Sequence, residues 1–241
     1  MKKTNIKEKI IEYIKSIAVA LVIYLVISTT IIKATQIYSG SMEDTLLIGD
    51  FLFINKFIYG IKIPYTDISL PALREPKPRD IIVFKVYQSP ISNDVKVTAT
   101  PGYESVNYVK RCIAVAGQTV EIRNKVVYVD GKPLPNPKSA KPTSDDILPS
   151  GFIEPDIFPT GNGNRDNYGP IKVPPGYLFM MGDNRDNSLD SRYWGFLPIK
   201  NIVGKPIITY WSWEKDVPLW DFFYKIRTIR WERIGRRPNW Y

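Results

Sequence analysis

Histidine is absent from the 241 residues of the chain, and cysteine occurs once, as Cys112. A single thiol cannot form an intramolecular disulfide, so the fold must rest on its apolar core. The same two shortages argue against a zinc site, because zinc is held mainly by thiolates and imidazoles. We therefore expect neither a metal nor a cofactor. A nucleophilic serine in this chain would also need a base other than imidazole, and lysine is the usual substitute.

Apolar residues make up 44% of the chain and include six Trp, fifteen Tyr and ten Phe, enough for a packed core, which excludes a disordered protein. The formal charge is +9, but the basic residues gather near the two ends of the chain and form no dense stripe among aromatics. That distribution does not match the footprint of a nucleic-acid-binding protein, and we expect no such partner.

An apolar run from Ser16 to Ile32 is the longest in the chain, and we interpret it as an uncleaved transmembrane anchor. Five lysines precede it against two glutamates, which places residues 1–15 in the cytoplasm and the remainder outside by the positive-inside rule. The alternative is the apolar region of a cleaved export signal. Such regions span roughly 7–15 residues and precede a small-x-small site. The sequence that follows here, Lys33-Ala-Thr-Gln-Ile-Tyr38, is a poor one.

Short apolar runs separated by Gly, Pro and Asn follow the anchor and predict an all-β domain over residues 33–131 and 171–210. Asn124-Lys125 is expected to close a hairpin between two of the runs. The predicted strands cover 51–55, 81–84, 108–114, 120–123, 126–129 and 177–181.

Two stretches rich in Pro, Ser, Asn, Asp and Gly interrupt this pattern, residues 64–78 and residues 132–170. The shorter one is expected to be a loop. The longer one is an insertion that we interpret as a surface excursion rather than a binding element, because loops tolerate insertions.

Residues 211–241 form an aromatic and basic C-terminal segment, in which tryptophans alternate with arginines and lysine. Indole and guanidinium groups together suit the headgroup layer of a membrane. The same aromatics would equally cap the β core while the arginines stay in solvent.

Three segments carry residues suited to chemistry, and each is weak alone. Ser39-Gly-Ser41 is by itself more typical of a solvated turn. Lys110 lies on a predicted strand whose alternation places it on one face with Tyr108 and Cys112, where it either extends to solvent at an edge or is desolvated. A desolvated lysine has a pKa nearer neutrality and accepts a proton.

The third segment is Gly182-Asp-Asn-Arg-Asp-Asn-Ser-Leu-Asp-Ser-Arg-Tyr-Trp-Gly195. Oxygen ligands at alternate positions would suit calcium, but Arg185 and Arg192 within the segment oppose a cation.

Taken together and in this order, the three segments resemble those of the bacterial type I signal peptidases, membrane-anchored Ser/Lys proteases. The resemblance rests on Ser39-Gly-Ser-Met42 with Thr45-Leu46, on Tyr108-Val-Lys-Arg111, and on the Gly182–Gly195 segment, and it extends from the anchor to about Gly204. It implies a β domain of antiparallel sheets behind one transmembrane helix. The implied activity is removal of signal peptides from exported preproteins after small-x-small sites.

The resemblance implies a role for six residues. Ser41 would be the nucleophile and Lys110 the general base, oriented by Ser188. The hydroxyl of Ser39 would join the Ser41 amide in the oxyanion hole, and Asp190 and Arg192 would form an ion pair that holds the Ser188 loop.

The positions that match the shallow apolar substrate pockets of the family are Ile37, Tyr38, Met42, Leu46, Tyr108 and Val109. Ordinary core packing is nearly as good an explanation for Leu46. The chain departs from the family pattern at Asp44 and Ala116, where proline is common, and at Tyr38, where a smaller residue is often found. Tyr38 leaves the shape of the pocket open.

The expected partners are signal-peptide-bearing preproteins and the lipid bilayer, with no obligate protein partner, at the bacterial cytoplasmic membrane. A self-cleaving repressor would share the Ser/Lys chemistry but needs a DNA-binding domain, and the first 40 residues offer only the predicted anchor. A tethered binding protein without catalysis is a second rival, against which the retained Ser41, Lys110 and Ser188 argue. An organelle processing peptidase of the same family is a third, but no Arg-rich, Ser-rich transit segment precedes the anchor.

Overall fold

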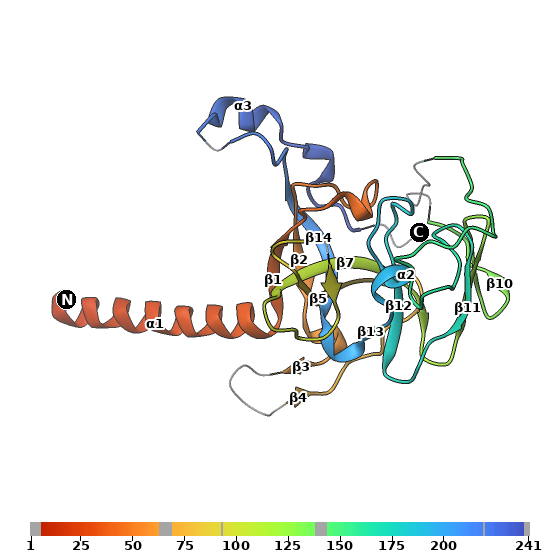
Figure 1. Ribbon diagram of the computed structural model, residues 1–241. Coiled ribbons are helices and arrows are strands. Elements are labelled where there is room, and N and C mark those ends of the chain that lie inside the picture. Colours follow the sequence, from red (N-terminus) through yellow and green to blue (C-terminus); the bar gives the residue numbers. More distant parts are fainter. Residues whose placement is uncertain (1–5, 63–68, 93, 138–143, 219, 239–241) are drawn as a thin grey trace.

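The computed structural model describes residues 6–62, 69–92, 94–137, 144–218 and 220–238. A long helix, α1 (Ile6–Thr30), projects from a β domain, and a short aromatic helix, α3 (Phe222–Arg227), extends from another side of it (Figure 1). Parts of the predictions for 1–15, 64–78, 132–170 and 211–241 lie outside the described residues.

The main sheet is antiparallel throughout. Its strands lie in the order β1 (Ile32–Gln36), β2 (Asp50–Asn55), β14 (Ile202–Ser212), β5 (Ile81–Gln88), β7 (Glu104–Val115), β12 (Tyr177–Met181) and β13 (Leu197–Pro198), with β6 (Val95–Lys96) beside β5. The segments that carry Ser41 and Lys110 are thus far apart in sequence but are held by one hydrogen-bonded framework.

A second antiparallel sheet consists of β10 (Lys132–Pro133), β9 (Val126–Val129), β8 (Thr119–Arg123) and β11 (Tyr168–Lys172). Asn124 and Lys125 close the β8–β9 hairpin with positive φ angles of 47° and 66°, as a tight primed turn requires. This confirms the predicted hairpin. Two further short strands, β3 (Ile61–Lys62) and β4 (Ser69–Leu70), pair with each other.

Strand β5 lies inside the main sheet, and its apolar residues are buried on both faces. Ile81, Ile82, Val83 and Phe84 of β5 are all buried, as the continuous apolar run predicted, with Ile82 and Phe84 in one core cluster and Ile81 in another. One of these clusters joins Ile37, Met42, Leu46, Leu52 and Ile81, and Val109 packs against it. The residues on either side of Ser41 are therefore anchored in the core.

All six predicted strands are present; β1 and β14 are among the strands that were not predicted. Residues 31 and 32 were assigned to the anchor, whereas Ile32 already pairs with Asn55. Strand β14 contains Gly204 and Pro206, two residue types that weaken a strand signal. The sheet accommodates both residues, because β14 shifts its register against β5 near Gly204 and against β2 near Pro206.

The structure does not support the transmembrane anchor predicted for residues 16–32. The helix begins at Ile6 and ends at Thr30, and it therefore includes Lys7, Lys9, Glu12 and Lys15. Among the residues that the structure describes, no helix combines the length and the apolar character that crossing a bilayer requires.

The insertion is more than a surface excursion. Ile157 and Tyr168 belong to a core cluster, and the buried Asn164 donates to the carbonyls of Pro149 and Phe152. Lys125, in the turn between β8 and β9, binds Asp166 from the insertion and Asp186 from the Gly182–Gly195 segment. The insertion therefore packs against that segment and supports it.

The C-terminal segment combines features of both alternatives. Trp211 belongs to β14, whereas Trp220 and Phe223 are strongly exposed. Two of its basic residues are buried, contrary to the idea of solvated charges: Lys225 donates to backbone carbonyls and Arg233, in the turn η4 (Trp231–Arg233), binds Asp50.

Candidate active site

Ser41 lies in a single 3-10 turn, η1 (Gly40–Met42), which is separated from the end of β1 by three residues. The turn continues beyond Met42, whose carbonyl accepts the amides of Thr45 and Leu46 at 3.1 and 2.7 Å. Ser41 is 8% exposed, and its hydroxyl oxygen lies 3.4 Å from that of Ser39. The buried side chain of Met42 fixes the turn in the core, which leaves the Ser41 hydroxyl at the surface of a groove.

Lys110 lies on β7, opposite Ile82 of β5, and only 2% of it is exposed. Burial lowers its pKa from 10.5 to about 8; the carboxylate of Asp190 opposes this shift and the guanidinium of Arg192 adds to it. The ammonium lies 5.5 Å from the centre of the Tyr108 ring. Of the two readings of this lysine, desolvation is the one that the structure supports.

Gly182 brings the Ser41 turn and Ser188 together. The β7–β12 register pairs Arg111 with Met181 and, continued by one residue, brings Gly182 level with Lys110. A Cβ at Gly182 would lie 2.2 Å from the Ser188 hydroxyl and 2.4 Å from the Ser41 carbonyl. Only glycine allows this approach. The Ser188 hydroxyl is buried and has no hydrogen-bond partner among the described residues.

Asp190 and Arg192 form the expected ion pair, and both are buried. Two guanidinium nitrogens each lie 2.9 Å from a carboxylate oxygen of Asp190, which also accepts the Gly182 amide at 3.1 Å. Burial alone would raise the pKa of Asp190, but the charge and hydrogen bonds of Arg192 outweigh it and hold that pKa below its usual range. Arg192 also donates to the carbonyls of Arg185 and Arg165, which ties the Ser188 loop to the insertion.

A second buried ion pair, between Arg111 and Asp183, had no role assigned from the sequence. Asp183 also accepts the Thr45 hydroxyl at 2.6 Å, and its amide lies 3.4 Å from the sulfur of Met42. Arg111, Asp183 and Thr45 thus join all three sequence segments. Each of the three residues is the sequence neighbour of a residue in the matched segments, Lys110, Gly182 or Leu46, and this was the only hint of a role in the site. No pattern in the sequence indicates which charged residues pair.

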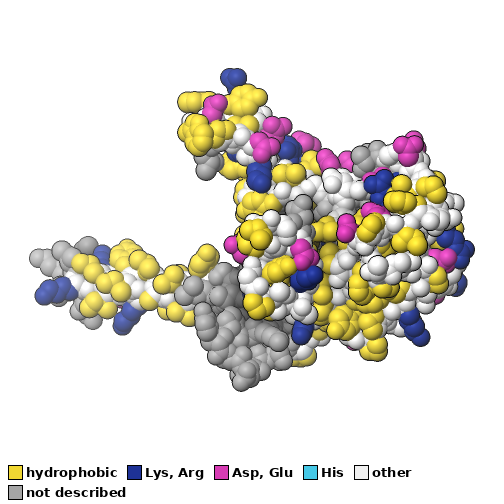
Figure 2. Space-filling model, viewed as in Figure 1, with side chains coloured by type: hydrophobic (Ala, Val, Ile, Leu, Met, Phe, Trp, Pro, Cys, Tyr) yellow, Lys and Arg dark blue, Asp and Glu magenta, His cyan; other side chains and the backbone are white. Residues whose placement is uncertain are grey.

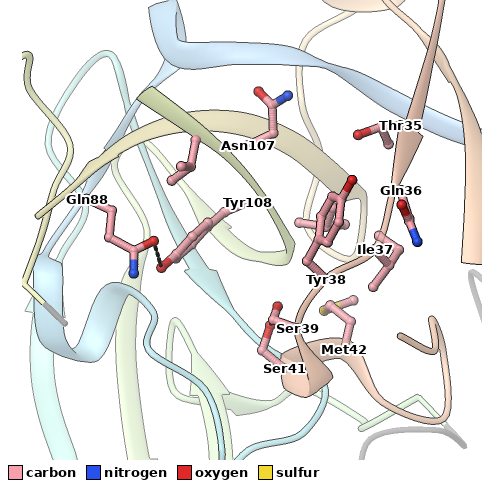
Figure 3. Close-up of a pocket in the computed structure, with 12 residues that line it drawn as sticks. Thr35, Gln36, Ile37, Tyr38, Ser39, Ser41, Met42, Gln88, Asn107 and Tyr108 are labelled. Atoms are coloured by element: carbon pink, nitrogen blue, oxygen red, sulfur yellow. Dashed lines mark hydrogen bonds between the residues drawn. The ribbon is translucent and has the colours of Figure 1, made fainter. Parts of the chain in front are cut away.

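A groove of about 480 Å³ opens beside the two serines (Figure 3). Five of the positions predicted to contact substrate line it: Ile37, Tyr38, Met42, Tyr108 and Val109. Leu46 does not, because it is fully buried in the core cluster beneath the groove. Further lining residues come from β1, β5 and β7 and were not predicted: Thr35, Gln36, Gln88, Val106 and Asn107. Figure 3 shows the Tyr108 ring with its hydroxyl directed at Gln88.

This arrangement agrees with comparisons against known proteins. The sequence profile of the family described as "Signal peptidase, peptidase S26" matches residues 10–211. The chain belongs to this family.

The chain is 34% identical to a protein named "Signal peptidase I" from Pseudomonas fluorescens, across 89% of the chain and 77% of that protein. It is 33% identical to "Probable signal peptidase I-1" from Synechocystis, across 90% of the chain and 91% of the relative. A crystal structure of a signal peptidase I from Enterococcus faecalis aligns with 27% identity and a TM-score of 0.36, covering 55% of the chain and 97% of that structure.

This signal peptidase family member is therefore a peptidase. Its fold brings the Ser41 carbonyl and the Ser188 hydroxyl to Gly182, which is level with Lys110, and places Asp190 and Arg192 close enough to Lys110 for their charges to act on its pKa. These residues come from three separate segments, which belong to one antiparallel sheet in the order β1–β2–β14–β5–β7–β12.

Proposed function

We propose that this peptidase removes N-terminal signal peptides from exported preproteins, with Ser41 as nucleophile and Lys110 as general base. The observation that carries the proposal is the burial of Lys110, which brings its pKa to about 8 beside a turn that presents a serine hydroxyl. A lysine amine is a base only when it is unprotonated, and burial away from water is the means by which proteins achieve this near neutral pH.

In the proposed reaction, the neutral amine of Lys110 takes the proton of the Ser41 hydroxyl as its oxygen attacks the carbonyl carbon of the scissile bond. When the C–N bond breaks, the lysine returns that proton to the leaving amine. Water, activated by the same amine, then hydrolyses the serine ester.

Ser39 and Ser188 have separate proposed tasks. The Ser39 hydroxyl lies 3.4 Å from the nucleophilic oxygen, close enough to donate to the oxyanion together with the Ser41 amide. Such a donor contributes about 3–4 kcal/mol to the transition state in other acyl-transfer enzymes. Ser188, whose buried hydroxyl finds no other partner in the described part of the chain, is proposed to orient the amine of Lys110.

We further propose that the groove holds the residues before the scissile bond. The side chains of Ile37, Met42 and Val109 form an apolar wall that is rigid because it belongs to the core. A rigid shallow wall accepts small side chains and excludes large ones by overpacking, which supports cleavage after small-x-small sites. Tyr38 and Tyr108 at the rim would limit the groove further.

The lipid bilayer is the second proposed partner. Helix α1 exposes apolar side chains along the length described, including Ile10, Ile14, Ile17 and Val22 (Figure 2). A helix that is apolar and uncovered needs a partner of matching polarity, and lipid would bring the peptidase to membrane-held precursors. Flotation with phospholipid vesicles tests this: the full chain is expected to float and a variant lacking residues 1–30 to remain at the bottom. Equal flotation of both would contradict a role for α1.

Cleavage of a purified preprotein in detergent tests the activity and its mechanism. The wild type should release a product whose new N-terminus follows a small-x-small sequence, and Ser41→Ala and Lys110→Met should each abolish cleavage. Cleavage by either variant at the wild-type rate would refute the dyad. A wild type that binds preproteins without cutting them would favour a binding protein.

A further inference from the structure

The C-terminal segment packs on the loop that carries the nucleophile, through residues that do not line the groove. We call residues 37–49, between β1 and β2, the nucleophile loop. Trp213 donates its amide to Gly49 at 3.2 Å, Arg230 donates to the Ile48 carbonyl at 2.9 Å, and Arg233 donates to the Thr45 carbonyl at 3.2 Å. A Cβ at Gly49 would lie 1.9 Å from the Trp213 carbonyl, so this contact admits only glycine.

Arg233 makes the strongest of these contacts. It is 5% exposed and binds Asp50, the first residue of β2, which has no exposure at all. Both carboxylate oxygens accept from the guanidinium, one of them from Nε at 2.8 Å. Asp50 also accepts the amide of Leu47 at 2.9 Å and the hydroxyl of Ser212 at 2.7 Å. The pair therefore joins the C-terminal segment, β14 and the nucleophile loop at one point.

Thr45 transmits this contact toward the site. Its carbonyl is held by Arg233, and its hydroxyl is held by Asp183, the partner of Arg111. Its amide donates to the carbonyl of Met42, the residue after Ser41. The backbone that follows the nucleophile is thus fixed from two opposite sides, by the C-terminal segment and by the residues beside Lys110.

We infer that Arg233 is a positioning residue: through Asp50 and Thr45 it holds the nucleophile loop at the depth where the Ser41 hydroxyl meets Lys110. This inference rests on the Ser41–Lys110 chemistry proposed above. The fork of a guanidinium is needed, because one group must reach a carboxylate and a backbone carbonyl together. A displacement of about 1 Å at a reacting group lowers the rate roughly 10²-fold, so the loss of this contact should lower kcat.

If the Asp50–Arg233 pair only stabilised the fold, its loss would lower kcat no further than the unfolded fraction explains. Variants separate this role from positioning. Arg233→Met removes both contacts but leaves the Asp50 carboxylate buried without its partner. The double variant D50N/R233M removes the charge as well, and still leaves the Thr45 carbonyl without its donor. Arg227→Met is the matched control, since Arg227 is an exposed arginine on α3 of the same segment.

The experiment measures kcat and KM for preprotein cleavage by full-length protein in detergent, together with the unfolding temperature and the hydrogen exchange of the Thr45 and Leu46 amides. We expect kcat to fall about 10- to 100-fold in both Arg233 variants with KM within about twofold. The two amides should exchange faster, and the unfolding temperature of D50N/R233M should exceed that of Arg233→Met. Arg227→Met should match the wild type.

If D50N/R233M kept the wild-type kcat and the wild-type amide exchange, the positioning role would be overturned. It would also be overturned if kcat fell only in proportion to the fraction of unfolded protein. These outcomes differ from a failure of the proposed function itself. In that case the wild type would not cleave the preprotein, or Ser41→Ala would cleave it equally well.

Discussion

The carboxylate of Asp183 accepts two hydrogen bonds from the guanidinium of Arg111, at 2.7 and 2.6 Å, and neither side chain reaches solvent to any extent. Arg111 adjoins the proposed base and Asp183 adjoins Gly182. The pair therefore locks the end of β12 against β7 at the level of the site, and the Thr45 hydroxyl attaches the nucleophile loop to the same carboxylate.

Arg111→Met should destabilise the fold strongly, because it leaves the buried carboxylate of Asp183 uncompensated. Breaking one partner of such a pair lowers the free energy of unfolding by roughly 3–5 kcal/mol. Urea denaturation followed by circular dichroism measures this change. Arg123→Met is the control, since its pair with Glu121 lies at the surface and should contribute little. A loss for Arg111→Met as small as that of the control would show that the pair is not structural.

Gly182→Ala should impair catalysis, because the added methyl must displace either the Ser188 hydroxyl or the Ser41 carbonyl. A shift of about 1 Å in either group would lower kcat roughly 10²-fold, measured by preprotein cleavage. Gly151→Ala is the matched control, since a Cβ there meets no atom within 4 Å and the backbone is not left-handed. Wild-type kcat in Gly182→Ala would contradict the close approach described for this site.

Ser188→Ala should lower activity without lowering stability. The buried hydroxyl has no partner within the described residues, so its removal should leave the free energy of unfolding unchanged or raise it by up to about 1 kcal/mol. The rate of cleavage should fall, since Lys110 loses its orienting group.

Ser191→Ala provides the opposite case for comparison with Ser188→Ala. Its hydroxyl accepts the amide of Met180 at 2.9 Å, so the variant should lose about 1–3 kcal/mol of stability. Thermal unfolding and initial rates, measured on both variants, distinguish the two serines. A stability loss in Ser188→Ala equal to that in Ser191→Ala would argue for a structural hydroxyl.

The rate of cleavage should rise with pH around the pKa of Lys110. Because burial lowers that pKa to about 8, the amine is mostly protonated at pH 6 and mostly neutral at pH 9. We expect kcat/KM, which reports the free enzyme, to increase over this range with an apparent pKa near 8. A profile that is flat from pH 6 to 9, or that rises only near 10.5, would exclude Lys110 as the base.

The same shift predicts that Lys110→Met is more stable than the wild type at neutral pH. The folded-state pKa of about 8 lies below 10.5, so between these values the unfolded chain binds more protons and wild-type stability rises with pH. Below pH 8 the full penalty applies, and at about 1.4 kcal/mol per pH unit it amounts to about 3 kcal/mol. Denaturant unfolding at pH 7 should show this gain, and the difference should shrink toward pH 10.5. A less stable Lys110→Met would mean that the lysine is held by favourable contacts.

Much of the fold was predictable because its signals are local. The continuous apolar run of β5 and the Asn124-Lys125 turn each fix their own backbone, and the structure confirms both. Strand β14 was not predictable in this way, since Gly204 and Pro206 read as breakers until neighbouring strands supply register shifts that accommodate them. The Leu46 side chain was similarly ambiguous, and only packing assigned it to the core.

For the site, the sequence by itself determined the chemistry available: with no histidine, a serine nucleophile must use another base, and Lys110 on its predicted strand was the candidate, either desolvated or extended to solvent at an edge. The tertiary structure alone decided which groups meet. The partners of Asp183, Asp190 and Asp50 lie two to 183 positions away. Because charge pairing depends on distance in space and on burial, sequence spacing carries almost no information about it.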